Sequence, residues 1–490
     1  MSLRRQAFKG AVALGAGRAV IDLCSFARNI IVARLLTPAD VGIGATFWIT
    51  VALLQMISDL AADRLLIQAK DGDEPRFQAS VQLWEFGRGV LNSVLLFALA
   101  WPAAYLFKSP QALWAFQCVA LIPLLRGLSH LDIRRMQRHL RYGPQTVVEA
   151  SGQIVSLLLA YPVCRLLGNY SALLVLTLVQ EGIKTGASFV LAERPYRWAW
   201  DRAYVRRLLG FGWPLLINGV LLFAIMKGDR LIVGTAFSTH DLGLYAMAFT
   251  LANTPFTLLG SVLNPLALPL LAAVQDQPAA FERRVRLCNA VFALAAGPVG
   301  IPLVLCAPWL LERIYGTSYA AAGGVFAWLI AARLLWFLRH PPTTAAIARA
   351  DTKNALFANV FRSSGVILAI ISALLRYPLA AIGLAAVIAE FTALLASAAR
   401  LRRQHAVPMS ATFVPLAVVG VALVAAGLLQ EAWHGLPSLS IIGLAAVLIG
   451  LYCGALVLAF PTLRVELHGA ASHALSRAAG VLVRSSGSRI

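Results

Sequence analysis

Long apolar runs fill this sequence and restrict what the chain can fold into. Fourteen of them follow one another along its 490 residues, and each is near the ~20 residues that an α-helix needs to cross a lipid bilayer. Charged residues make up only 13% of the chain, whereas soluble domains carry about 25%. A backbone in lipid must satisfy its own hydrogen bonds, so we expect these runs to be helices. The sequence predicts an all-α, multi-pass membrane protein with about fourteen transmembrane helices.

The charges between the runs predict the orientation of the chain. The expected spans are 10–33, 41–61, 81–106, 113–128, 147–167, 171–192, 213–236, 242–273, 287–311, 321–338, 356–375, 379–399, 413–429 and 441–460. Arginine and lysine gather in alternate loops, which identifies those loops, and with them both termini, as cytoplasmic. This loop bias also accounts for the net charge of +20, so no nucleic-acid partner is expected.

A short stretch of the chain occurs twice, at a constant offset of 201 residues. Residues 28–45 resemble residues 229–246: Asp40-Val41-Gly42-Ile43 matches Asp241-Leu242-Gly243-Leu244. The first and the seventh expected spans both start in the cytoplasm, so the two halves have the same orientation, as in parallel transporter repeats. We therefore predict two parallel, pseudo-symmetric lobes of six helices, residues 1–205 and 206–405. Residues 406–490 are expected to add two further spans and a cytoplasmic tail.

Charged residues inside the spans are candidates for a substrate site, because charge is costly in lipid. On the first span, Arg18, Asp22 and Asn29 share one face. A cleft between the lobes that carries several arginines favours an anionic ligand. A local i, i+4 ion pair between Arg18 and Asp22 is the alternative interpretation. The cleft candidates are Arg18, Asp22, Arg28, Asn29, Asn218, Lys227, Asp229, Arg230 and Arg333.

Two glutamates lie near the middle of their spans, Glu181 in the sixth and Glu390 in the twelfth. A carboxylate at that depth can bind a coupling proton or sodium ion, or it can neutralise a neighbouring cation. We predict them as ion-coupling candidates. A buried pair of Glu181 with Lys184 is the alternative.

No motif of covalent chemistry is found in the sequence. The P-loop pattern, the zinc-protease pattern and the serine-hydrolase pattern are absent, and the six cysteines lie in or at the edges of apolar runs with no metal-ligand spacing. We expect no cofactor, no metal and no catalytic residue.

The motifs around the repeat resemble those of the oligosaccharide flippases of polysaccharide biosynthesis, within the multidrug/oligosaccharidyl-lipid/polysaccharide exporter superfamily. The resemblance covers most of residues 5–400 and is carried by residues 33–42, 63–68, 229–234, 242–245, 264–265, 275–276 and 315–320. It implies a flippase that moves a polyprenyl-diphosphate-linked oligosaccharide across the bacterial inner membrane by alternating access. It also implies membrane lipids, a polysaccharide polymerase and a chain-length protein as partners.

Three other functions stay open on the sequence. A cation-coupled drug antiporter of the same superfamily would favour an acidic cleft, and here basic residues at least match the acidic ones. A flippase of the peptidoglycan lipid precursor is a close variant of the first function. An integral-membrane polymerase or ligase needs a large external loop, and the expected external loops are short.

Overall fold

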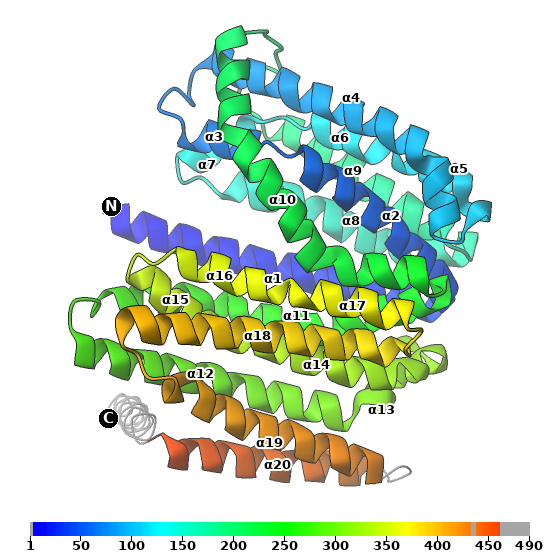
Figure 1. Ribbon diagram of the computed structural model, residues 1–490. Helices are drawn as coiled ribbons and strands as arrows, with labels where there is room; N and C mark the ends of the chain where they lie inside the picture. The colour runs from blue at the N-terminus through cyan, green and yellow to red at the C-terminus, as the bar shows by residue number, and fades with distance from the viewer. Residues whose placement is uncertain (1–2, 433–437, 461–490) are drawn as a thin grey trace, which may run out of the picture. The chain divides into compact units, whose positions relative to one another are not determined.

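The computed structural model describes residues 3–432 and 438–460, and its helices confirm the all-α prediction (Figure 1). Twelve segments of this described part are long and apolar enough to cross a membrane. Two further helices, α1 (Leu3–Leu35) and α10 (Arg202–Ala236), carry more charge but have 33 and 35 residues. With them the described part of the chain holds fourteen long helical segments, one for each predicted span.

Several spans are built from two or three consecutive helices. The remaining elements are α2 (Pro38–Ser58), α3 (Ala62–Gln68), α4 (Pro75–Leu106), η1 (Pro110–Ala112), α5 (Leu113–Val119), α6 (Leu121–Leu128), α7 (Asp132–Arg138), α8 (Gly143–Leu167), α9 (Ser171–Val190), α11 (Thr239–Ala272), α12 (Pro278–Leu305), α13 (Ala307–Tyr315), η2 (Thr317–Ala322), α14 (Gly323–Leu338), α15 (His340–Ala348), α16 (Lys353–Arg362), α17 (Ser364–Leu374), α18 (Leu379–His405), α19 (Ser410–Ala432) and α20 (Ser438–Ala459).

The helices form two compact units. The first contains the described residues up to 261, with 308–329 and 363–386; the second contains 262–307, 330–362 and the described residues from 387 onward. The chain passes between the units five times: within α11, α13, α14 and α18, and between α16 and α17. The lobe boundaries at residues 205 and 405 stay a prediction.

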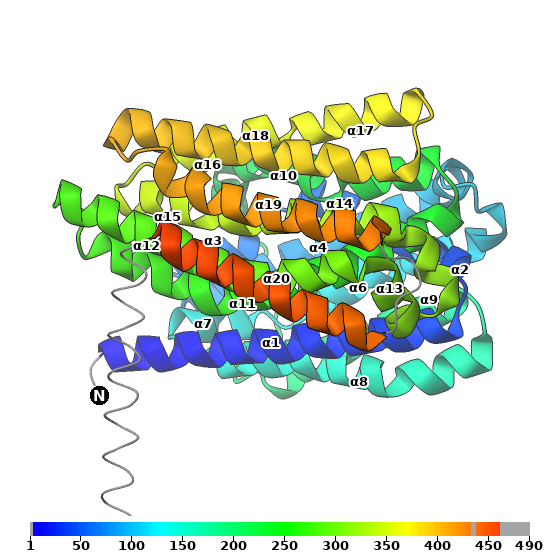
Figure 2. The ribbon, with the colours of Figure 1, turned by 90° about the horizontal axis from the view of Figure 1, so that it is seen from below.

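In the first unit, α1 packs on α8 (Figure 2), and α8 packs on α9. Helix α4 packs on α5 and α6, and α10 packs on both α2 and α17. Apolar side chains from α3, α4 and α10 meet in a cluster around the fully buried Phe77. This cluster holds α3, α4 and α10 together near the polar cavity described below.

In the second unit, α12 packs on α15, α19 and α20. Tyr452 on α20 fixes part of this packing, because its hydroxyl donates a 2.6 Å hydrogen bond to the carbonyl oxygen of Ala293. The ring of Tyr452 lies against Gly297, where a β-carbon would come within 2.0 Å of it. The last span, α20, is thus attached to α12 by a side chain that fits closely.

The repeated sequence motif forms the same helix start in both copies. The amide of Asp40 donates to the hydroxyl oxygen of Thr37 over 3.2 Å, and the amide of Asp241 donates to that of Ser238 over 3.1 Å. Each hydroxyl donates back to the aspartate, over 2.5 and 2.7 Å. This reciprocal arrangement is a variant of the capping box that begins a helix. The repeated Thr/Ser and Asp residues are therefore structural.

Candidate functional site

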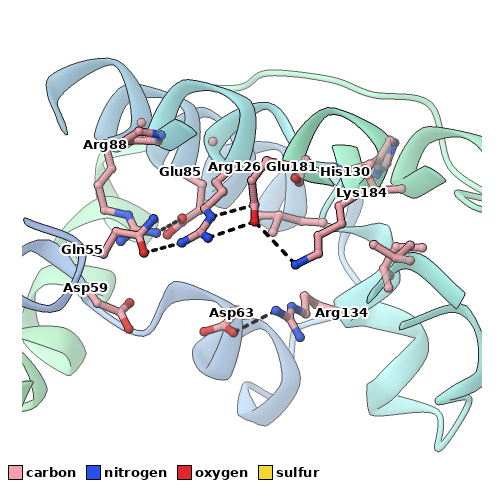
Figure 3. Close-up of a pocket in the computed structure, with 18 of the residues that line it drawn as sticks. Gln55, Asp59, Asp63, Glu85, Arg88, Arg126, His130, Arg134, Glu181 and Lys184 are labelled. Atoms are coloured by element: carbon pink, nitrogen blue, oxygen red, sulfur yellow. Dashed lines mark hydrogen bonds and ion pairs between the residues drawn. The ribbon is translucent and has the colours of Figure 1, made fainter. Parts of the chain in front are cut away.

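A polar cavity of about 530 Å³ lies inside the first unit (Figure 3). It is bordered by side chains from α2, α4, α6, α8 and α9 and from the short segments that connect them. Its charged lining consists of five carboxylates and four cationic groups: Asp59, Asp63, Glu85, Glu149, Glu181, Arg88, Arg126, Arg134 and Lys184. So many ionisable groups among apolar helices are costly, and such groups by default mark a functional pathway.

Glu181 on α9 is the most deeply buried carboxylate of this cavity, with 4% of its side chain exposed. Arg126, on the last turn of α6, donates two hydrogen bonds to this carboxylate: Nε lies 2.8 Å from Oε2 and Nη2 lies 3.0 Å from Oε1. This two-point pairing is the strong geometry for arginine and carboxylate. The same guanidinium also donates to the side-chain oxygen of Gln55 on α2. Arg126 therefore ties α2, α6 and α9 together at the cavity wall.

Lys184 extends the network by one turn of α9. Its ammonium lies 3.5 Å from Oε1 of Glu181 and 3.1 Å from Oε2 of Glu149 on α8. The predicted Glu181–Lys184 pair is therefore present. The four groups alternate in sign, Arg126, Glu181, Lys184 and Glu149, so their charges balance.

Two more ion pairs border the cavity. Glu85 and Arg88, one turn apart on α4, pair at 2.5 Å. Asp63 on α3 and Arg134 on α7 pair at 3.6 Å (Figure 3), and both keep about a third of their side chains exposed. A cavity of this size with both hydrogen-bond donors and acceptors is suited to a polar, many-hydroxyl ligand.

The fully buried Asp132 fixes the segment behind the cavity. It accepts a 2.6 Å hydrogen bond from Arg135, and the amides of Glu193 and Arg194 donate to it over 2.8 and 3.2 Å. Burial alone would raise the pKa of Asp132. These hydrogen bonds outweigh burial and hold that pKa below its ordinary value. The connection from α9 to α10 is thereby attached to α7.

The ionised carboxylate of Asp132 should stabilise the folded protein at pH values above about 3.9, the ordinary pKa of aspartate. Since the folded-state pKa is lower, this stability is complete above pH ~4 and is lost as the pH falls through the folded-state value. We expect Asp132→Asn to lower the unfolding free energy at neutral pH by about 1–3 kcal/mol and to remove part of the acid sensitivity. Thermal unfolding in detergent from pH 3 to pH 7 measures both effects. The matching change of the exposed Asp276 to Asn should alter neither.

On the first span, the cleft candidates have different partners in the structure. Arg18 and Asp22 form the i, i+4 pair at 3.3 Å, and 66% of the Arg18 side chain is exposed. Arg28 instead donates to the side-chain oxygen of Gln180 over 2.7 Å and to the hydroxyl of Ser156 over 3.3 Å. Arg28 therefore joins α1 to α8 and α9 through uncharged partners. Asn29 lies half-buried beside it.

On the seventh span, the candidates contact α11. The hydroxyl of Tyr245 donates to Asp229 over 2.8 Å, and the Arg230 guanidinium lies 3.8 Å from the centre of the Phe249 ring. Lys227 is half-buried. Asn218 belongs to α10, but its side chain lies outside the described part of the structure. Arg28 and Asp229, which are equivalent in the repeat, thus contact different helices.

In the second unit, Arg333 and Glu390 come together at 3.5 Å. Two arginines that were not among the sequence candidates join them, Arg339 at 3.4 Å and Arg362 at 2.6 Å from the carboxylate.

Arg126, Glu85, Arg88 and Glu149 were also not among those candidates. A buried glutamate such as Glu181 needs a cationic partner, and this need was the one signal that could have indicated Arg126. The partner lies on another helix, however, and the pattern along a single helix does not show which residue it is.

Comparisons with known proteins agree with this architecture. A family model described as "Polysaccharide biosynthesis protein" matches residues 31–323. The chain is 25% identical over 294 residues to the amylovoran biosynthesis protein AmsL of Erwinia amylovora, covering 58% of this chain and 74% of that one. It is 20% identical over 364 residues to the teichuronic acid biosynthesis protein TuaB of Bacillus subtilis (strain 168), covering 73% and 74%.

Among solved structures, the fold is similar to lipid II flippase MurJ in an inward closed conformation. The TM-score is 0.71 at 12% identity, over 91% of this chain and 99% of that one. An inward-facing multidrug resistance MATE transporter gives 0.58 at 12% identity, over 83% and 95%. The fold is therefore that of multi-pass membrane flippases and multidrug transporters. The chain belongs to the polysaccharide biosynthesis protein family.

Proposed function

We propose that this protein is a flippase for a polyprenyl-diphosphate-linked oligosaccharide in the bacterial inner membrane. The polar cavity of the first unit is the observation that carries the proposal, because it places both signs of charge among membrane-spanning helices. Hydroxyl groups of sugars are donors and acceptors, so they suit a lining of carboxylates, guanidiniums and amides. Membership of the polysaccharide biosynthesis protein family supports the choice of a sugar substrate.

We propose that the cavity faces the cytoplasm. The segments that border it continue into α7 and its flanking loop, which carry Arg134, Arg135, Arg138 and Arg141. Such basic segments stay on the cytoplasmic side of membrane proteins. In this orientation both termini are cytoplasmic. The oligosaccharide enters from the side on which it is assembled, and alternating access of two lobes releases it on the other.

A further proposal concerns Glu181 and Glu390, the two candidates for coupling transport to an ion. Glu181 and Glu390 each have cationic groups at both carboxylate oxygens. This geometry favours their role as counter-ions over that of ion carriers. We propose that the protein moves its substrate without any covalent reaction. A polymerase and a chain-length protein would then act on the transported oligosaccharide.

The proposal is tested by deleting the gene in its native strain and by reconstituting the protein. We expect the deletion to abolish surface polysaccharide and to leave lipid-linked oligosaccharide protected from reagents outside the cell. In proteoliposomes, the purified protein should expose a labelled lipid-linked oligosaccharide to an external glycosidase. Normal polymer in the deletion strain would refute this function, and resistance of an expressing strain to toxic cations would favour a drug antiporter. Essentiality of the gene would favour the peptidoglycan precursor as substrate.

A further inference from the structure

A second cavity of the first unit lies beside the connection from α9 to α10. Its volume is about 250 Å³, against about 530 Å³ for the cavity described above. Its polar lining consists of Gln78, Gln82, His130, Arg194 and Arg197. The larger cavity is bordered by five carboxylates, whereas none of the described residues that line the smaller one is acidic. Pockets for drug-sized ligands have about 300–1,000 Å³, so this smaller, positively charged cavity suits a small anionic group.

One wall of this cavity, the connection of residues 192–201, is held against α4 by side chains. Arg194 donates to the side-chain oxygen of Gln78 over 3.1 Å. The ring of Trp198 stacks on that of Phe86, with 4.8 Å between the ring centres. The wall that carries both arginines is therefore built on the first turns of a long helix.

The two carboxylates of this connection have cationic partners outside the cavity. Glu193 pairs with Arg135 at 2.9 Å and with Arg141 at 2.7 Å. Asp201 pairs with Arg76 at 3.6 Å. Neither Glu193 nor Asp201 lines the cavity, so an anion that enters it meets the positive charge of the lining.

The ends of the neighbouring spans place the cavity at the level of the lipid headgroups. Its lining residues from α4 lie between positions 75 and 82, where the apolar run of that helix begins. Arg197 is exposed, and Trp198 and Trp200 beside it leave 52% and 68% of their surface exposed. Exposed tryptophans next to the end of a span are typical of the headgroup region. An arginine at this depth can contact lipid phosphate.

We propose that this cavity binds the phosphate group of an anionic phospholipid through Arg194 and Arg197. A guanidinium carries about five N–H donors in a planar fork that matches phosphate oxygens. Basic pockets between membrane helices on the cytoplasmic side bind acidic lipid headgroups. The phospholipid is a constituent of the membrane, so the site does not depend on which substrate is transported. Only its cytoplasmic side rests on the orientation proposed above.

His130 connects this site with the larger cavity, because it borders both. Its Nδ1 accepts a 3.1 Å hydrogen bond from the amide of Asp132. Its ring meets those of Phe189 and Tyr196 edge to face, with 5.5 and 5.4 Å between the ring centres. A bound headgroup therefore lies one side chain away from the larger cavity, beside the connection that joins the two predicted lobes.

Binding of short-chain phosphatidylglycerol to the purified, full-length protein in detergent tests the site. We expect binding about tenfold or more tighter than that of phosphatidylcholine, whose headgroup has no net charge. Arg197→Gln should weaken the binding of phosphatidylglycerol about fivefold, as expected for one arginine facing an anionic headgroup. Arg202→Gln removes an exposed arginine of the same basic stretch that does not line the cavity, and it should leave the affinity unchanged. Equal affinity for the two lipids, or equal losses in the two variants, would overturn the site.

A variant without any change of charge tests the cavity itself. Ala79 is buried and lines the cavity, so Ala79→Leu narrows it and should also weaken binding. If this variant does not fold, Arg197→Lys replaces it, because it keeps the charge but loses the planar fork. Unchanged affinity in the folded variant would contradict binding inside the cavity or by the guanidinium, respectively.

Inorganic phosphate separates the two sources of the phosphate group. We expect it to displace phosphatidylglycerol only at concentrations at least about tenfold higher than those at which the lipid binds, because the lipid also contacts the exposed tryptophans. Displacement by inorganic phosphate at the same concentrations as the lipid would assign the cavity to a free ion and overturn the phospholipid. Weakened lipid binding in Arg197→Gln with normal surface polysaccharide would support a phospholipid site that is separate from transport.

Discussion

Replacing Arg126 with glutamine should reduce surface polysaccharide to the level of a deletion strain. The substitution removes the two-point partner of Glu181 and leaves that buried carboxylate with Lys184, which Glu149 already shares. Breaking one side of a buried ion pair costs about 3–5 kcal/mol. It also removes the contact of α6 with Gln55 on α2. Surface polysaccharide, measured per amount of protein in the membrane, reports the combined effect.

The double variant Arg126→Gln, Glu181→Gln distinguishes a functional role from a structural one. It removes both charges, so the uncompensated carboxylate is gone and the amount of folded protein should recover. If the cavity charges contact the substrate, transport should stay lost in this variant. Full recovery of polysaccharide would show that the pair only holds the helices together. Arg286→Gln serves as the control, because it breaks a partly exposed i, i+4 pair on α12, and ion pairs near the surface contribute about 0–1 kcal/mol.

The transmembrane helices could be predicted because each is specified locally. Lipid demands a long apolar run for every span, and such runs are visible in the sequence. Their ends shifted where charged turns extend a helix beyond the apolar run, as in α10, which begins at Arg202 instead of Trp213. The repeat itself was visible in the sequence, whereas the helix caps at Thr37 and Ser238 were found only in the structure.

The site was only partly predictable, because it depends on which helices are neighbours. The polar stripe of α1 predicted cleft candidates at Arg18 and Asp22, with an i, i+4 ion pair as the alternative; the ion pair is present, and the cleft stays a prediction. Arg126 and Glu181 are separated by 55 residues and meet only through the packing of α6 on α9. Glu390 and Arg333 were both found as buried charges, yet nothing in the sequence indicated that Arg339 and Arg362 would join them. Periodicity assigns a residue to a face, and it does not identify the helix opposite that face.

The repeated glycines give the second large expected effect. A β-carbon on Gly42 would lie 1.7 Å from the carbonyl oxygen of Thr239, and one on Gly243 would lie 1.8 Å from that of Pro38. Pro38 and Thr239 are themselves equivalent in the repeat, so the contact is reciprocal: each helix start touches the glycine of the other copy. Small residues allow such close approach of membrane helices. In both clashes the obstacle is backbone, which cannot rotate away as a side chain can.

We therefore expect Gly42→Ala and Gly243→Ala each to destabilise the protein by about 1–3 kcal/mol, the usual cost of overpacking, and to reduce transport. Both methyl groups would separate the same two backbones, so the double variant should cost clearly less than the two single variants together. Thermal unfolding of the four proteins in detergent measures this coupling. Gly186→Ala is the matched control, since a β-carbon there meets nothing within 4 Å. Strictly additive losses would mean that the two glycines act at independent contacts, and unchanged stability in both single variants would mean that α2 and α11 do not touch at this crossing.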